Sequence, residues 1–317
     1  MNLMKWKHTN LHVSPLAFGA LRFLGPKDNP EDPERVRNAE ELVETCLASG
    51  INFFDHADLY GHGNCEKIFG AVLRRHPDWR GKMVIQTKCG IRVDGLHRYD
   101  QSPEHMIKTV EGSLQRLGVE QLDVLLVHRP DPLLDPVSVA SVFERLRSEG
   151  KVRYFGVSNF SVAQMRLLQS ACDEPLVANQ IQLSLLHPWA ISEGVFVNRT
   201  ESVFCGAEGV VDHCRREGIQ VQAWSPVAAG HFSKESDTDD ERTKAVREAV
   251  AKVAAESGLS REAVALAWIL RHPGGIVPII GTMKPERVRE SVQALDLQMD
   301  SDTWWRLFNA ALGRRLP

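Results

Sequence analysis

The sequence lacks the features that mark several protein classes. Its net charge of −3 over 317 residues gives no bias toward nucleic acids or other polyanions. No apolar run approaches the roughly 18 residues of a membrane span, and none of signal-peptide length follows the lysines near the start. The six cysteines include no Cys-x-x-Cys pair, and a chain of this size folds without disulfides. We therefore expect a cytoplasmic protein with reduced, mostly buried thiols, no nucleic-acid partner and no membrane contact.

The usual glycine-rich nucleotide-binding loops are also absent. The nearest approach to Gly-x-Gly-x-x-Gly is the run from Gly61 to Glu66, which has glutamate in place of the third glycine. The sequence contains no P-loop either. These absences argue against a doubly wound dinucleotide-binding fold.

What the sequence does contain is a repeated alternation of short apolar runs with amphipathic helical stretches, which is typical of βα units around a parallel sheet. Helix-start signals follow several of the runs, such as Asp32-Pro33, Ser102-Pro103 and the capping pair Ser161 and Gln164. The candidate strands are 15–19, 51–55, 83–87, 123–128, 152–157, 177–183, 219–224 and 276–280. We predict one α/β domain over 1–317: a (β/α)8 TIM barrel with an N-terminal β-hairpin (4–13) at the barrel bottom and extra C-terminal helices.

Side chains able to move a proton lie where three of these strands end. Asp55, Lys88 and His128 fall at the ends of the second, third and fourth strands, and Tyr60 follows Asp55 by five residues. Each one alone is more often a solvated, capping or core residue. In a barrel, however, the C-terminal ends of the strands form the active site, so the four can meet there. A free tyrosine has a pKa of about 10, and an adjacent ammonium lowers it. The set is therefore suited to donating a proton to a carbonyl oxygen.

An ordered series of short motifs extends along nearly the whole chain. The motifs are Asp-x-Ala-x-x-Tyr-Gly (55–61), Thr-Lys (87–88), His128, Gly-Val-Ser-Asn (156–159), Asn-Gln (179–180), Trp-Ser-Pro (224–226) and Ile-Ile-Gly-Thr (279–282). In this order and spacing the chain resembles the aldo-keto reductase family. The Asp-His-Ala-Asp form (55–58) and the Ala-Ala-Leu-Gly ending (310–313) look most like a bacterial subgroup of general oxidoreductases.

The resemblance implies NADPH-dependent reduction of an aldehyde or ketone to an alcohol. Tyr60 would be the general acid, and the general base in the reverse direction. Lys88, paired with Asp55, would lower the pKa of the phenol, and His128 would orient the substrate carbonyl. The substrate pocket would be lined by Phe23, Tyr60, His128 and Trp189.

The implied cofactor is NADPH/NADP⁺. By resemblance, Ser158, Asn159 and Gln180 would hydrogen-bond the carboxamide of the nicotinamide, and Trp224 would stack on its ring. Arg287 would bind the 2′-phosphate, which favours NADP over NAD because a guanidinium matches a phosphate in a bidentate manner. Glu290 and Ser291 would approach the adenine. The other cofactor-binding residues would be Gly19, Ala20, Leu21, Asp55, Ser225, Pro226, Val227, Gly230, Gly281, Thr282, Met283 and Lys284.

Two other interpretations remain open. His56, His62 and Cys65, with Asp55 or Asp58, can be drawn as a zinc site, but their spacing matches no standard finger and we expect no metal. The other alternative is an NADPH-binding sensor or regulatory subunit with little or no turnover. Occupation of all four catalytic positions favours an enzyme. We expect a monomer that acts on a small carbonyl compound whose identity the sequence does not define.

Overall fold

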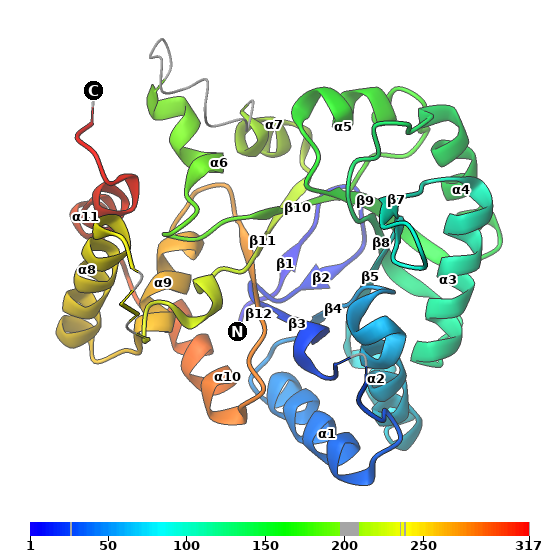
Figure 1. Cartoon of the computed structure of the whole chain (residues 1–317), viewed down its shortest axis with the longest axis horizontal. Coiled ribbons are helices and arrows are strands. Elements are labelled where there is room, and N and C mark those ends of the chain that lie inside the picture. The colour runs from blue at the N-terminus through cyan, green and yellow to red at the C-terminus, as the bar shows by residue number, and fades with distance from the viewer. Residues whose placement is uncertain (26, 197–208, 235, 238, 317) are drawn as a thin grey trace.

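The centre of the computed structural model is a closed barrel of eight parallel strands surrounded by helices (Figure 1). The structure describes residues 1–25, 27–196, 209–234, 236–237 and 239–316. The barrel strands are β3 (Ala17–Gly19), β4 (Phe53–Asp55), β5 (Val84–Cys89), β8 (Leu122–Val127), β9 (Val152–Ser158), β10 (Ala178–Gln182), β11 (Gln220–Trp224) and β12 (Val277–Ile280). They follow one another around the barrel in chain order, and each overlaps one candidate strand. The predicted (β/α)8 barrel is confirmed.

Helices begin where the sequence supplies caps. The Asp32 carboxylate accepts hydrogen bonds from the first turn of α1, and Ser161 and Gln164 form the predicted capping box of α5. The helices are α1 (Pro33–Ala48), α2 (Asn64–Arg75), α3 (Pro103–Leu117), α4 (Pro136–Ser148), α5 (Val162–Gln169), α6 (Trp189–Ser192), α7 (Val210–Glu217), α8 (Glu241–Ser257), α9 (Arg261–Leu270), α10 (Pro285–Val292) and α11 (Ser301–Leu312). The C-terminal helix α11 packs beside α8 outside the barrel (Figure 1). Among the described residues, no helix combines the length and apolar character that a membrane span requires.

The N-terminal hairpin closes one end of the barrel, as predicted. Its strands β1 (Met4–Lys5) and β2 (His12–Val13) are antiparallel and shorter than the predicted hairpin. Between them Trp6 is buried, and its ring meets the ring of Phe53 edge-on at a centroid distance of 5.3 Å. A second two-stranded hairpin, β6 (Ile91–Arg92) and β7 (Arg98–Tyr99), follows β5.

Side chains alternate along the strands between the barrel interior and the surrounding helices. In β4, Phe53 joins the apolar cluster of the interior, whereas Phe54 packs outward against Phe69 of α2. The next inward position holds Asp55. In β5 the same alternation places Gln86 and Lys88 after the inward-facing Val84. The interior therefore changes from apolar at the hairpin end to polar at the C-terminal ends of the strands.

Candidate active site

A turn with unusual backbone geometry carries Tyr60 into the space above the strand ends. After β4 the chain forms a short 3₁₀ turn, Tyr60–Gly63, in which Gly61, His62 and Gly63 have φ angles of 56°, 53° and 86°. A Cβ atom on Gly61 would lie 2.6 Å from the carbonyl oxygen of Leu24, so that position requires glycine. The turn ends where α2 begins. This geometry explains why tyrosine is followed directly by glycine in the motif.

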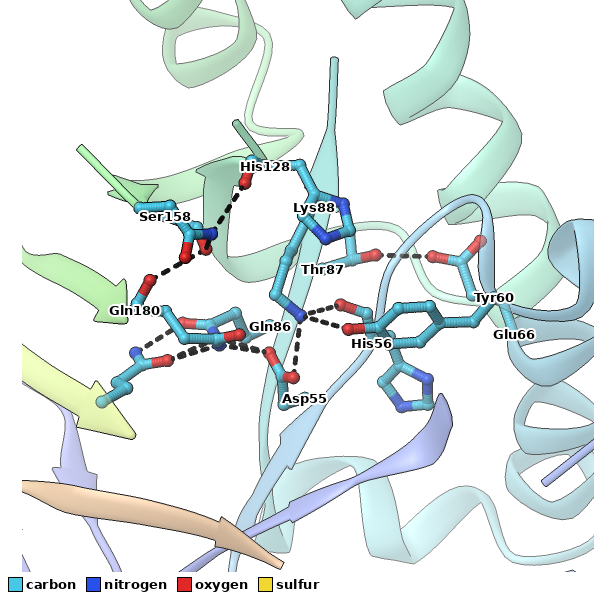
Figure 2. Close-up of polar contacts among 12 residues, drawn as sticks. Asp55, His56, Tyr60, Glu66, Gln86, Thr87, Lys88, His128, Ser158 and Gln180 are labelled. Atoms are coloured by element: carbon cyan, nitrogen blue, oxygen red, sulfur yellow. Dashed lines mark hydrogen bonds and ion pairs between the residues drawn. The ribbon is translucent and has the colours of Figure 1, made fainter. Parts of the chain in front are cut away.

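The structure brings the four predicted catalytic side chains together (Figure 2). The Lys88 ammonium is buried and donates to Asp55 Oδ2 at 2.7 Å, to the His56 carbonyl oxygen at 2.8 Å and to the Tyr60 hydroxyl at 3.1 Å. The rings of Tyr60 and His128 lie edge-on, with their centroids 6.1 Å apart. Two strands, β4 and β5, and the loops that follow β4 and β8 thus supply the members of a single polar cluster.

The electrostatics of Tyr60 differ from the sequence-based expectation. Burial raises the pKa of the phenol above its ordinary value of 10.0; the Lys88 charge acts to lower it, and the Asp55 charge raises it further. Burial also acts to lower the pKa of Lys88, but Asp55 and Tyr60 outweigh it, so that pKa is raised and the amine stays charged. The expected net lowering of the Tyr60 pKa is therefore wrong, because burial and the nearby carboxylate together exceed the effect of the ammonium. The phenol remains protonated, and available as a proton donor, at neutral pH.

His128 is held as a neutral ring. Burial, together with the charges of Lys88 and Arg129, lowers the pKa of its imidazole to about 2. Its Nδ1 atom is buried and has no hydrogen-bond partner among the described residues. A neutral imidazole can hydrogen-bond a carbonyl oxygen through its N–H without competing with the phenol as the acid.

Three buried glutamines form a layer directly beside Asp55, and Figure 2 labels two of them, Gln86 and Gln180. Asp55 Oδ1 accepts from Gln86 Nε2 at 2.6 Å and from Gln180 Nε2 at 3.0 Å. Gln222 Oε1 accepts from the same two nitrogens at 2.8 and 2.9 Å, and Gln222 Nε2 donates to Gln86 Oε1 at 2.8 Å. Gln86 and Gln222 were not among the predicted site residues. The alternation of side chains along a strand could have indicated them. Each lies two positions before a predicted site residue, Lys88 or Trp224, and so faces the same side of the sheet.

The residues predicted to meet the nicotinamide are connected to one another. Ser158 ends β9 and donates to the main-chain oxygen of Gln180 at 2.9 Å. Asn159 has a φ of 62°, donates to Ser158 Oγ at 2.8 Å, and accepts from Trp224 Nε1 at 3.0 Å. The indole of Trp224 is fixed by this bond, and the guanidinium carbon of Arg129 lies 5.6 Å from the centre of its ring.

The loop after β11 holds several residues in the left-handed region. The φ angles are 53° for Ser225, 45° for Ala228, 55° for Ala229 and 88° for Gly230, and the predicted residues Pro226 and Val227 lie between them. Residues other than glycine rarely adopt a positive φ, and backbone strain of this kind is concentrated at functional sites.

The loop after β12 leads into the N-terminus of α10. Thr282 Oγ1 accepts from Lys284 N at 3.1 Å, and α10 has no side-chain cap. Pro285 has no N–H, and Arg287 N donates to the main-chain oxygen of Lys284 at 3.0 Å, so among the first three residues of the helix only the N–H of Glu286 has no partner in the described part of the chain. Lys284 and Arg287 are exposed at this end, together with Met283, and Gly281 precedes them. The two cationic side chains and the unpaired N–H of Glu286 suit a phosphate.

Farther along α10, Ser291 is buried, and its hydroxyl donates to the carbonyl oxygen of Arg287 at 2.7 Å. Glu290 beside it is half-buried. The hydroxyl proton of Ser291 is thus already used within the helix.

The predicted residues Gly19, Ala20 and Leu21 lie where β3 meets a short 3₁₀ helix. A Cβ on Gly19 would approach Ile279 Cγ2 to 2.9 Å, so the Ile279 side chain of β12 packs directly against the Gly19 backbone. Ala20 is buried and Leu21 is exposed. Only Leu21 projects a large side chain into solvent.

Two further residues were predicted for the pocket wall, Phe23 and Trp189. Phe23 is 5% exposed and packs against Phe18 and Phe69. This burial places the Phe23 side chain in the apolar cluster around the barrel, and its part in the pocket wall stays a prediction. Trp189 begins α6 and contacts His187 and the guanidinium of Arg242, whose carbon lies 5.4 Å from its ring centre.

The residues of the zinc alternative do not converge. The ring of His56 is buried against Phe69, at a centroid distance of 4.4 Å, and Cys65 Sγ donates to the main-chain oxygen of Leu24 at 3.2 Å. Within the part of the chain that the structure describes, no three or more His, Cys, Asp or Glu side chains are placed to hold a metal ion.

Comparison with known proteins decides the family. The model of the Aldo/keto reductase family matches residues 15–310. The chain belongs to the aldo-keto reductase family. It is 40% identical over 284 residues to the uncharacterized oxidoreductase YcsN of Bacillus subtilis, which covers 87% of this chain and 89% of that protein. It is 36% identical over 316 residues to the 6-dehydroglucose reductase of Novosphingobium aromaticivorans, covering 98% and 95% of the two chains.

A solved structure supports the fold of this aldo-keto reductase. The glycerol dehydrogenase of Gluconobacter oxydans superposes with a TM-score of 0.82 at 23% identity, covering 100% of this chain and 98% of that one. Family membership and the named relatives make the protein an oxidoreductase.

Proposed function

We propose that this aldo-keto reductase uses NADPH to reduce aldehydes or ketones to alcohols, with Tyr60 as the general acid. The observation that carries the proposal is the Tyr60 hydroxyl, 3.1 Å from the buried Lys88 ammonium and beside the neutral His128 ring. This arrangement places a protonated donor next to a group that stabilises its conjugate base.

Each member of the cluster has a distinct part in this chemistry. The cofactor supplies the hydride. Tyr60 transfers its hydroxyl proton to the carbonyl oxygen as negative charge develops there, and the Lys88 ammonium stabilises the phenolate that remains. Asp55 holds the ammonium in place, and the N–H of His128 orients the carbonyl. General acid catalysis of this kind contributes roughly 10²–10⁴-fold to the rate.

The residues present fit a nicotinamide cofactor at both ends. At the carboxamide end, Ser158, Asn159 and Gln180 offer polar atoms beside the indole of Trp224, which can stack on the ring. At the other end, the uncapped N-terminus of α10 and the exposed Arg287 suit the 2′-phosphate. This pairing of an arginine with a helix N-terminus favours NADP over NAD.

Substrates are proposed to be small carbonyl compounds, bound by a monomer. Two relatives, from Novosphingobium aromaticivorans and Agrobacterium fabrum, are named 6-dehydroglucose reductases, at 36% and 35% identity. A sugar aldehyde therefore belongs in any substrate panel beside simple aromatic and aliphatic aldehydes.

The direct test follows NADPH oxidation by absorbance with 4-nitrobenzaldehyde, a sugar aldehyde and a simple ketone. We expect turnover with at least one carbonyl, and a lower KM for NADPH than for NADH. Tight NADPH binding without turnover of any carbonyl would instead support the sensor alternative. Failure to bind NADPH would contradict both.

A further inference from the structure

We propose that Gln86 and Gln222 are positioning residues that connect the Asp55–Lys88 pair to Gln180 and fix which atom of the Gln180 amide faces the cofactor. The inference rests on the proposed function, since it concerns the nicotinamide carboxamide. It extends that proposal to two residues on β5 and β11 that lie beneath the cofactor site.

The direction of every amide in this layer follows from the charge of Asp55. An ionised carboxylate only accepts hydrogen bonds, so the amide nitrogens of both Gln86 and Gln180 must turn toward Oδ1. Each of these nitrogens has two hydrogens, and the second is directed at the Oε1 atom of Gln222 in both cases. Gln222 is therefore a shared acceptor, and with it both hydrogens of each amide nitrogen, in Gln86 and in Gln180, are used.

This arrangement leaves the carbonyl oxygen of Gln180 as the only free polar atom of its amide. Oε1 of Gln180 accepts no hydrogen bond from the described residues. This oxygen is also not one of the fully buried atoms that lack a partner, so a ligand can reach it. It can accept a hydrogen bond from a carboxamide N–H₂. If the amide were flipped, its oxygen would face the oxygen of Asp55 and its nitrogen would face the cofactor, which would present a donor in place of an acceptor.

Burial makes this orientation strict. The exposed fractions of Gln86 and Gln222 are 0%, and that of Gln180 is 2%, so water cannot easily replace a lost partner. Removing one member leaves buried donors or acceptors unsatisfied, and the remaining amides are then free to rotate. The effect of such a change should therefore appear where Gln180 meets the carboxamide.

The experiment compares two cofactors in one protein. NADP⁺ carries a carboxamide, whereas its 3-acetylpyridine analogue has an acetyl group, which keeps the carbonyl but has no N–H to donate. Dissociation constants of both are measured by quenching of tryptophan fluorescence. We expect the wild-type protein to prefer NADP⁺ by about two- to tenfold, the range of one hydrogen bond between neutral groups. In Gln222→Met the ratio should fall toward one, and in Gln86→Met it should fall in the same direction but less.

Gln220→Met is the matched control. Gln220 lies on the same strand, but its amide donates to the main-chain oxygens of Val221 and Gly275, outside the layer. This variant should keep the wild-type ratio. Because each ratio is taken within one preparation, a smaller folded fraction cancels.

Two outcomes would overturn the inference: an unchanged ratio in both layer variants, or equal binding of the two cofactors by the wild-type protein. If the wild-type protein binds neither cofactor, the proposed function fails and this inference fails with it. That result is distinguishable from the other two because it appears before any substitution is made.

Discussion

The barrel interior is apolar at the end that the hairpin closes and polar at the end that carries the candidate active site. The same strands supply both parts. Phe53 and Val84 face the interior near the hairpin, and two residues farther on β4 and β5 place Asp55 and Gln86 there. The two regions differ in what keeps them folded.

The apolar end gains stability mainly from burial, at about 25 cal/mol per Å² of apolar surface removed from water. The polar end gains little in this way, because its charges and amides lose their hydrogen bonds to water. Hydrogen bonds within the protein must replace them. Nearly every donor near Asp55 therefore has a defined acceptor. One end of the barrel thus provides stability, and the other end uses part of that stability to hold polar and charged groups in place.

The largest expected effect is on turnover, and it compares removal of a tyrosine hydroxyl at each end of the barrel. Tyr60→Phe should reduce turnover by roughly 10²–10⁴-fold while leaving cofactor affinity nearly unchanged, because the proton donor is lost and the residues that bind the cofactor stay in place. Steady-state kinetics with NADPH and a carbonyl substrate, with fluorescence titration of the cofactor, measure both quantities.

Tyr154→Phe is its control. The Tyr154 hydroxyl donates to Asn10 Oδ1 at 2.9 Å at the hairpin end, so its removal should leave turnover intact. Near-native turnover in Tyr60→Phe would refute the role of the phenol as the acid.

The second prediction concerns the apolar end. Phe53→Ala should lower the free energy of unfolding by about 3–5 kcal/mol, because it opens a cavity beside Trp6 and Val84. Turnover per folded molecule should stay near the wild-type value. Denaturant unfolding and active-site-normalised kinetics check the two parts, and a loss of kcat comparable to that of Tyr60→Phe would show that the ends are not separable.

A smaller effect is expected at His56, on the outer side of the polar end. Both ring nitrogens are buried without a hydrogen bond among the described residues, and burial, with Lys88, lowers the pKa of the ring to about 3. His56→Phe should raise the free energy of unfolding by about 1 kcal/mol near neutral pH, because it removes two unsatisfied polar atoms.

The gain from this substitution should grow as pH falls. Below the ordinary pKa of 6.5 the unfolded histidine binds a proton that the folded one does not, so the wild-type protein loses stability between about pH 6.5 and 3. The variant lacks that contribution. Urea unfolding at neutral pH and at about pH 5 compares the two proteins, and identical pH dependence would contradict the assignment.

The smallest effect is a shallow pH profile for reduction. Because burial raises the pKa of Tyr60 above 10.0, the phenol keeps its proton through the neutral and mildly alkaline range. We expect kcat for reduction to vary less than about twofold there and to decline only as pH passes the ordinary tyrosine pKa. A decline centred near neutral pH would show that Lys88 outweighs burial.

Several features could be predicted because local patterns set them. Apolar runs defined the barrel strands, and the rule that barrel sites form at strand ends brought Asp55, Lys88 and His128 together. The net pKa of Tyr60 could not be predicted, since it depends on burial and on a carboxylate that opposes the effect of Lys88. Nor could the burial of Phe23, which depends on Phe69 of a later helix.

The glutamine layer was hidden for a different reason. Gln86 and Gln222 are 136 residues apart in the sequence, and no local motif around either one predicts its contact with the other. A polar residue at an inward strand position indicates only that a partner must exist. Which partner it is depends on how the barrel closes.

One acceptor of the Lys88 ammonium belongs to the main chain. It is the carbonyl oxygen of His56, at 2.8 Å. Because this oxygen belongs to the main chain, a substitution of the side chain at position 56 leaves it in place beside Lys88. Position 56 therefore offers a route for adapting the protein to acid surroundings while the proposed proton-transfer residues are left untouched.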